Sequence, residues 1–169
     1  MQEREDKHIY EDYNFDLESY LSQIEVENAI PKNGILILPN ENWRQSGKPV
    51  YMPETYRFVK WVKQTDVVQS EINLVELKKS NVASLRSDEI WLPIAYVFSD
   101  ASFQIFLNVA ASYLYDKLKG LLKNEDMTVH LEILKEDKLA KKVKRFLYDG
   151  SYAGLKEIIK KIDVNEFME

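Results

Sequence analysis

Residues 99–162 decide the fold of this chain, and they divide into three segments: SDASFQIFLNVAASYLYDKLKGLL (99–122), MTVHLEILKEDKLAKKVKRFLYDG (127–150) and SYAGLKEIIKKI (151–162). Apolar residues are too dense in the first segment to form a single stripe. This density predicts a helix over 101–122 that is buried on most of its sides. Asp100 and Ser102 are the candidate caps for its start.

The second and third segments predict two strands followed by a helix. Residues 127–133 alternate between apolar and polar, which is typical of a strand with one buried face, and 143–148 form its return strand. Asp149 and Gly150 predict a turn that leads to Ser151 as the cap of the last helix. In that helix the apolar residues Tyr152, Leu155, Ile158, Ile159 and Ile162 mark one face.

The preceding half of the chain supplies the remaining elements. Apolar spacing predicts helices near 17–24 and 54–63, and short apolar runs predict strands at 35–38, 72–77 and 90–98. A long loop is expected over 40–53, with a brief strand at most at 50–52. Because Pro93 cannot donate to a ladder, the 90–98 strand is expected either at a sheet edge or short on one side of the proline.

These elements predict an α+β fold. It would have a small mixed sheet, a buried central apolar helix, and a C-terminal β-hairpin followed by an amphipathic helix. The length of 169 residues suits one core. We expect an acidic amphipathic leader over 1–30 and a single domain over 31–169, made of an N-terminal part (31–98) and the helix-strand-strand-helix unit (99–163).

Charge is concentrated in the leader. Residues 1–27 hold nine acidic and two basic residues, whereas the rest of the chain holds 19 acidic and 21 basic ones. This balance argues against phosphate-backbone binding by the whole chain. The leader is expected either to stay solvated or to dock on a basic surface of the body or of a partner through the stripe Leu17, Tyr20, Leu21 and Ile24.

The absence of cysteine excludes disulfides, thiolate zinc sites and cysteine nucleophiles, and together with the lack of a secretory leader it predicts a cytoplasmic protein. Asp100, Gln104 and Asn108 interrupt the apolar run 91–115, and Pro93 lies near its start. A short strand followed by a buried helix therefore fits this run better than a membrane span. We expect no membrane partner.

One constellation suggests a reaction. Asp66, Glu76 and Lys78 resemble the acidic strand of the PD-(D/E)xK nucleases, in which the two carboxylates would bind a divalent cation and the lysine would orient the attacking water. The chain departs from that pattern, because no proline precedes Asp66 and the spacing to Glu76 is short. The competing interpretation is an exposed strand edge.

Other chemistry finds little support in the sequence. His8 and His130 are the only histidines and lie in unrelated segments, and His130 is expected on the polar face of its strand. With five glycines, neither a phosphate-binding loop nor a dinucleotide fingerprint occurs. We therefore expect no resident metal and no cofactor.

A basic cluster surrounds the turn of the predicted hairpin: Lys135, Lys138, Lys141, Lys142, Lys144 and Arg145. Such residues can bind nucleic acid, but lysines on a hairpin also protect a sheet edge from pairing with other chains. Glu136 and Asp137 dilute the positive charge. We favour the solvated surface and expect no nucleic-acid partner.

From Phe103 to Ile162 the order of elements resembles small accessory domains of bacterial conflict systems, of the effector-associated constant component type. The resemblance is carried by the helix end YLYDKL (113–118), by the strand TVHLEI (128–133), and by Asp149-Gly150 before GLKEII (154–159). It implies a non-catalytic coupler beside an effector and supplies no catalytic residues. The aromatic-rich helix departs from that family.

Two functions follow as hypotheses. The first is a non-enzymatic accessory or protein-interaction module that binds a co-encoded partner or a second copy of itself, in a bacterial defence or conflict system. The alternative is the metal-dependent nuclease that would use Asp66, Glu76 and Lys78.

Overall fold

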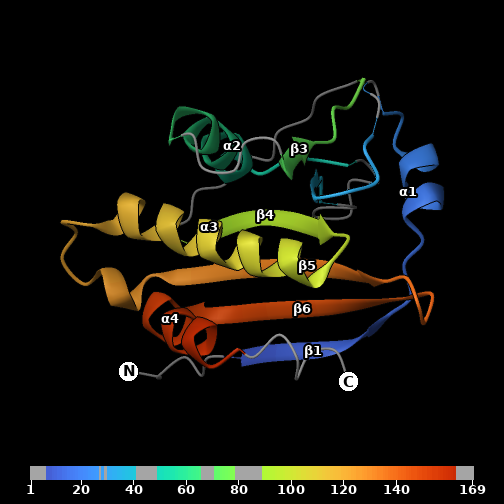
Figure 1. Cartoon of the computed structure of the whole chain (residues 1–169). Coiled ribbons are helices and arrows are strands. Elements are labelled where there is room, and N and C mark those ends of the chain that lie inside the picture. Colours follow the sequence, from blue (N-terminus) through green and yellow to red (C-terminus); the bar gives the residue numbers. More distant parts are fainter. Residues whose placement is uncertain are drawn as a thin grey trace.

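A six-stranded mixed sheet forms the centre of the computed structural model, with its strands in the order β1-β6-β5-β4-β2-β3 (Figure 1). The structure describes residues 7–26, 28, 30–40, 49–65, 71–78 and 89–162. The strands are β1 (Lys7–Tyr13), β2 (Ile35–Leu38), β3 (Ile72–Leu74), β4 (Ile90–Val97), β5 (Thr128–Asp137) and β6 (Lys142–Ser151). The helices are α1 (Leu17–Gln23), α2 (Pro53–Thr65), α3 (Asp100–Leu118) and α4 (Tyr152–Lys161).

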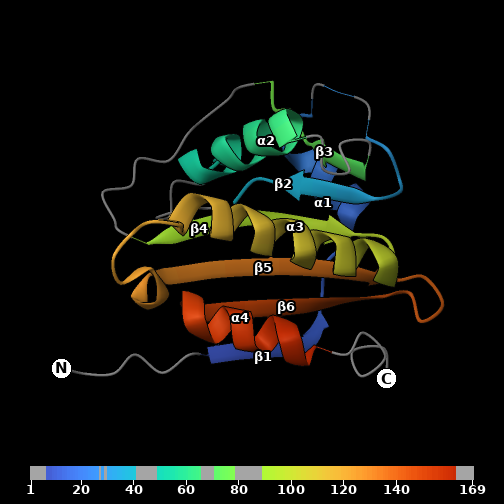
Figure 2. The same cartoon turned by 60° about the vertical axis from the view of Figure 1, so that its left-hand side comes forward.

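Three helices cover one face of the sheet, where α2, α3 and α4 lie side by side (Figure 2). The apolar face of each helix meets the inward residues of the strands. Phe58 of α2 packs against Phe106 of α3 with ring centroids 5.9 Å apart, and Phe103 of α3 packs against Phe146 of β6 at 6.3 Å. These four side chains are at most 1% exposed. The α+β fold with a buried apolar helix is therefore confirmed.

The β5–β6 hairpin and the helix after it are also confirmed, but the strands are longer than expected. Asp149 and Gly150 were expected in a turn, yet both pair with β5 inside β6, opposite His130 and Val129. Gly150 is buried within this ladder, so the two residues extend β6 instead of ending it. Ser151 does cap α4, since its Oγ accepts a hydrogen bond from the backbone N–H of Gly154 at 3.0 Å.

Of the two arrangements expected for Pro93, the sheet edge is wrong, whereas the strand is short on one side of the proline, with only residues 90–92 before it. β4 is an inner strand, parallel to β5 and antiparallel to β2. Its ladder with β5 shifts register between Trp91 and Ile94, so the proline lies where regular pairing is interrupted. A bulge thus accommodates the missing N–H inside the sheet.

The boundaries of α3 also differ from expectation. Ser99, rather than Asp100 or Ser102, caps the helix, because its Oγ accepts a hydrogen bond from Ser102 N–H at 3.1 Å. The helix ends at Leu118. Leu121 and Leu122, expected in its buried part, are 54% and 96% exposed.

The strand expected over 72–77 is shorter in the structure, where β3 ends at Leu74. The next residues still follow the sheet, since Val75 N–H donates to the Ile37 carbonyl at 3.1 Å.

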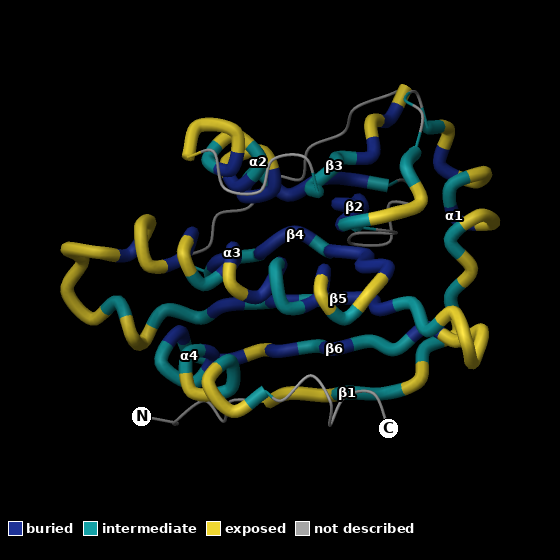
Figure 3. The backbone as a smooth tube through the Cα atoms, viewed as in Figure 1, coloured by how far each residue is buried: buried dark blue, intermediate teal, exposed yellow. Residues whose placement is uncertain are grey.

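β1 is an element that the sequence analysis did not predict. Residues 7–13 of the expected leader form this edge strand, which pairs along its whole length with β6. Its residues are exposed or half-buried, in contrast to the mostly buried β4 (Figure 3). The chain then turns into α1, which stands at one end of the sheet, apart from the other helices.

Candidate functional site

A groove of about 480 Å³ lies between α1 and the turn that joins β5 to β6. Two groups of residues that the sequence analysis considered separately meet there, although they lie more than a hundred positions apart. The apolar wall includes Phe15, Leu17, Leu21 and Tyr96, and the rim includes Lys138, Lys141 and Lys142. We call this cavity the α1 groove.

Contacts with the sheet hold α1 beside this groove. Asp16 caps the helix, because its Oδ1 accepts a hydrogen bond from Glu18 N–H at 3.0 Å. The Tyr20 hydroxyl donates to the Pro39 carbonyl at 3.0 Å. Phe15, just before the helix, packs on the ring of Tyr96 at 5.8 Å. The groove wall is therefore anchored at both ends of the first helical turn.

The structure divides the predicted stripe of α1 into two pairs. Tyr20 and Ile24 are 6% and 8% exposed and belong to the core. Leu17 and Leu21 are half-buried and line the α1 groove. One side of the short helix thus stabilises the fold, and only its neighbouring edge presents apolar surface to a partner.

The predicted basic cluster does not form a single patch. Lys144 lies over the ring of Tyr10 at 5.2 Å, and Arg145 points to the opposite sheet face, where it pairs with Glu11. Lys135 is buried and pairs with Asp100. In the part of the chain that the structure describes, only the three groove lysines of this cluster, Lys138, Lys141 and Lys142, remain exposed and make no ion pair.

Glu136 is the residue of the α1 groove that sequence reasoning missed. Its Oε2 atom is buried and has no hydrogen-bond partner among the described residues. A buried carboxylate oxygen without a donor is costly, because almost all buried polar atoms in folded proteins are paired. Burial and the nearby Glu136 carboxylate both raise the pKa of Tyr96. The groove therefore contains an acceptor that lacks its donor.

A signal for Glu136 does exist in the sequence. The alternation that predicted a strand over 127–133 places His130 and Glu132 on the polar face, and Glu136 continues the same parity. The predicted strand ends at Ile133, and Leu134 does not continue the alternation. In the structure Leu134 is covered and only 3% exposed, so both faces of β5 are apolar at that point.

A second cavity, of about 370 Å³, lies on the sheet face opposite the three helices. Tyr13, Ile94, Glu132 and Arg145 are among its lining residues. Burial raises the pKa of Glu132, the nearby guanidinium of Arg145 opposes that shift, and Asp149 adds to it. Arg145 binds Glu11 through Nε at 3.1 Å, so its charge is already compensated within the fold.

Both ring nitrogens of His130 contact a carboxylate. Its Nε2 lies 3.0 Å from a carboxylate oxygen of Glu89, and its Nδ1 hydrogen-bonds the carboxylate of Asp149. The ring stacks on Trp91 with centroids 3.7 Å apart. Both nitrogens are therefore occupied, and neither is available as a base or as a metal ligand in this arrangement.

The structure describes two of the three residues of the nuclease hypothesis, Glu76 and Lys78. Asp66 lies outside the described residues. Glu76 and Lys78 follow β3 and are exposed, and their backbone N–H groups donate to the Asn28 side chain at 2.9 Å and the Glu25 carbonyl at 3.1 Å. The nuclease assignment stays a prediction.

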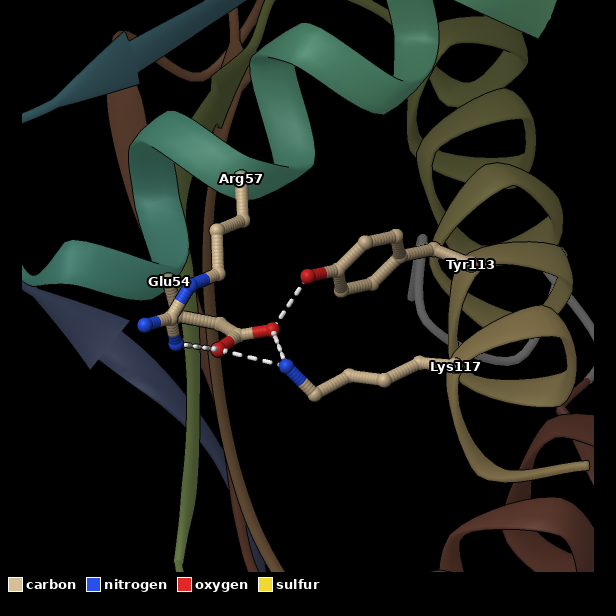
Figure 4. A network of polar contacts seen from close by, with 4 residues as sticks. All are labelled: Glu54, Arg57, Tyr113 and Lys117. Carbon is tan, nitrogen blue, oxygen red and sulfur yellow. Dashed lines mark hydrogen bonds and ion pairs between the residues drawn. The ribbon is translucent and has the colours of Figure 1, made fainter.

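A buried polar network joins α2 to α3 on the helix side of the molecule (Figure 4). The carboxylate of Glu54 accepts hydrogen bonds from the hydroxyl of Tyr113 and from Lys117 Nζ, and it pairs with Arg57 at 3.2 Å. Burial and the bond to Glu54 raise the pKa of Tyr113. Both carboxylate oxygens have partners, which indicates a stabilising role.

Comparisons with protein-family models, with curated proteins and with solved structures give no match for this chain. Within the described residues, no group of three or more acidic or histidine side chains is placed to hold a metal ion. None of the described helices combines the length and the apolar character that a membrane crossing requires.

Proposed function

We propose that this chain is a non-enzymatic protein-interaction module that binds an extended segment of another protein in the α1 groove. The observation that supports this proposal best is the meeting of the half-buried Leu17 and Leu21 with three exposed lysines of the hairpin turn in one groove. Apolar surface bordered by unpaired charge is the usual composition of a surface that binds another protein.

The groove also favours a particular chemistry in its partner. Leu17 and Leu21 offer apolar surface to an apolar side chain. Lys138, Lys141 and Lys142 offer exposed positive charge to acidic side chains. Glu18 and Asp137 also line the groove, but Lys32 Nζ lies 3.1 Å from Glu18, and Asp137 accepts a hydrogen bond from the backbone N–H of Leu139. The expected ligand is therefore a peptide segment with an apolar residue flanked by acidic ones.

The likeness to accessory domains of bacterial conflict systems suggests where that partner is encoded. We propose that it is a protein encoded beside this chain, such as the effector of a defence system. In that arrangement the module would couple the effector to another component and would perform no chemistry itself.

Peptide display on the immobilised full chain tests the proposal. We expect selection from a random library to enrich peptides with an apolar residue flanked by acids, and their affinity should fall as salt screens the lysines. Substitution Lys141→Glu, on the exposed rim, should weaken the selected peptides at least tenfold without unfolding the protein. Leu21→Asp should do the same from the apolar wall.

Leu122→Asp is the matched control, because it makes the same chemical change at a leucine that is 96% exposed and outside the groove. Its peptide affinity should equal that of the parent. If selected peptides lack acidic residues, or bind Lys141→Glu and Leu21→Asp as tightly as the parent, the proposal is wrong.

A further inference from the structure

The outer edge of β1 carries a charge pattern that is complementary to itself. β1 stands at the end of the strand order, and all seven of its residues pair with β6 on the inner side. No strand in the described ranges pairs with its outer side. Such an edge presents backbone N–H and C=O groups that can extend the sheet.

The residues of β1 read KHIYEDY, with basic side chains at the start and acidic ones at the end. Lys7, His8 and Asp12 are exposed, and none of them makes an ion pair with a described residue. Ile9 is 45% exposed, which is high for an isoleucine in a strand. The edge therefore combines free charges of both signs with a central apolar side chain.

We infer that two copies of this chain associate through antiparallel pairing of their β1 strands. A two-fold axis perpendicular to the sheet relates the two copies and leaves every side chain on the face that it already occupies. Residues that lie opposite one another in an antiparallel pair have their side chains on the same face. The axis must therefore lie midway between the two copies of one residue, which we call an axis through that residue. An axis through Tyr10 pairs all seven residues. It places His8 opposite Asp12 of the second copy and Lys7 opposite Tyr13, with Glu11 diagonal to Lys7. Ile9 then lies opposite Glu11, whose carboxylate Arg145 of the same chain already binds.

Other pairings of the same edge are disfavoured. A parallel pairing in register places Lys7 against Lys7 and Asp12 against Asp12, and like charges directly opposite destabilise a sheet. An axis through Ile9 would also oppose unlike charges, Lys7 and Glu11, but it pairs only residues 7–11, whereas the axis through Tyr10 pairs the whole strand. This inference rests on β1 alone and is independent of the proposed peptide binding in the α1 groove.

Sedimentation velocity of the full chain over a range of concentrations tests the inference. The parent should show a concentration-dependent dimer. His8→Asp creates two contacts between like charges and should raise the dimer dissociation constant by about tenfold. The swap H8D/D12H exchanges the two side chains within the strand, so a histidine again lies opposite an aspartate, and it should restore the parental constant.

Lys160→Glu is the control, because this exposed residue of α4 lies outside β1 and changes the net charge in the same direction. It should leave the dimer unchanged. The chain has no cysteine, so Tyr10→Cys gives a single thiol at the predicted axis, and mild oxidation should link two copies.

A parent that stays monomeric at high concentration overturns the inference. The same holds if His8→Asp dimerises as strongly as the parent, or if H8D/D12H fails to recover. Peptide binding in the α1 groove would be unaffected by any of these outcomes, so the two proposals fail separately.

Discussion

The ammonium of Lys117 lies 2.6 Å from Oε1 of Glu54, and this ion pair connects α3 to α2 across the helical layer. The Glu54 side chain is 9% exposed and also accepts hydrogen bonds from the Tyr113 hydroxyl and from Arg57, so its removal leaves three donors without their partner. A buried pair that loses one member costs more than an exposed pair does, because the remaining group stays desolvated.

We therefore expect Glu54→Ala to lower the free energy of unfolding by about 2–4 kcal/mol, since it leaves the partners of a buried carboxylate unpaired. Urea denaturation followed by circular dichroism measures this change. Glu157→Ala is the control, because its pair with Lys160 is exposed and 3.9 Å long. It should cost less than about 0.5 kcal/mol. Equal losses for the two variants would contradict a stabilising role for the network.

Gly34 should not tolerate a side chain. Its φ is +72°, and a Cβ atom there would lie 2.7 Å from the Glu71 carbonyl oxygen. Gly120 has a similar φ of +81° but open space around it. We expect Gly34→Ala to cost about 2–4 kcal/mol and Gly120→Ala about 1 kcal/mol, because both are strained and only the first also clashes. Thermal or urea unfolding gives the free energy of unfolding of both variants. The difference between their losses is the cost of the clash, because the backbone strain is common to both.

Alkaline pH should destabilise the fold through its buried tyrosines. Burial, with added effects of Asp100, Asp12 and Asp137, raises the pKa of Tyr10 to about 12. Burial raises the pKa of Tyr51 still further, and that of Tyr113 rises with the help of Glu54. A raised folded-state pKa gives stability that is complete below the unfolded value, about 10, and is lost as pH rises through the folded value.

We expect the free energy of unfolding to fall from about pH 10 upward. Tyr10→Phe should fall less steeply between about pH 10 and 12, because it removes one such group. Absorbance of phenolate in the folded protein gives a second measurement, and the buried tyrosines should ionise after the others. Simultaneous ionisation of all ten tyrosines in the folded protein would count against this prediction.

Glu136 should lower the stability of the fold. Because its Oε2 is buried without a donor, Glu136→Met is expected to raise the free energy of unfolding by about 1–2 kcal/mol. Urea denaturation measures this change. Glu157→Met, at an exposed site on α4, is the control and should leave the free energy of unfolding unchanged. A less stable Glu136→Met variant would show that the carboxylate has a partner in solution.

The nuclease alternative gives a direct assay. We expect purified full-length protein to leave single- and double-stranded DNA and RNA intact in the presence of Mg²⁺ or Mn²⁺. Cleavage that Glu76→Ala abolishes, and that an exposed control such as Glu157→Ala retains, would support the alternative and overturn the non-enzymatic proposal.

Local patterns in the sequence determined most of the helices and the inner strands. The apolar run 35–38, the dense apolar segment after residue 100 and the stripe of the last helix each became the expected element. These predictions are confirmed because periodicity and capping act within a few residues of one another. Ser151 illustrates this, since it caps α4 through its neighbour Gly154.

Only the tertiary structure decided what those elements meet. β1 has no alternating apolar pattern, and it forms a strand because β6 offers a partner edge along its whole length. Pro93 lies inside an inner strand because a shift in register accommodates it. The local sequence contains neither of these partners, so periodicity could not predict them.

The α1 groove shows the same division. The sequence by itself determined an amphipathic helix with Leu17 and Leu21 on its stripe and a lysine-rich turn at 138–142. It did not determine that the two lie side by side with Glu136 between them, because that depends on the packing of Phe15 against Tyr96 in β4. Residues brought together by sheet pairing and core packing acquire a shared environment that sequence distance conceals.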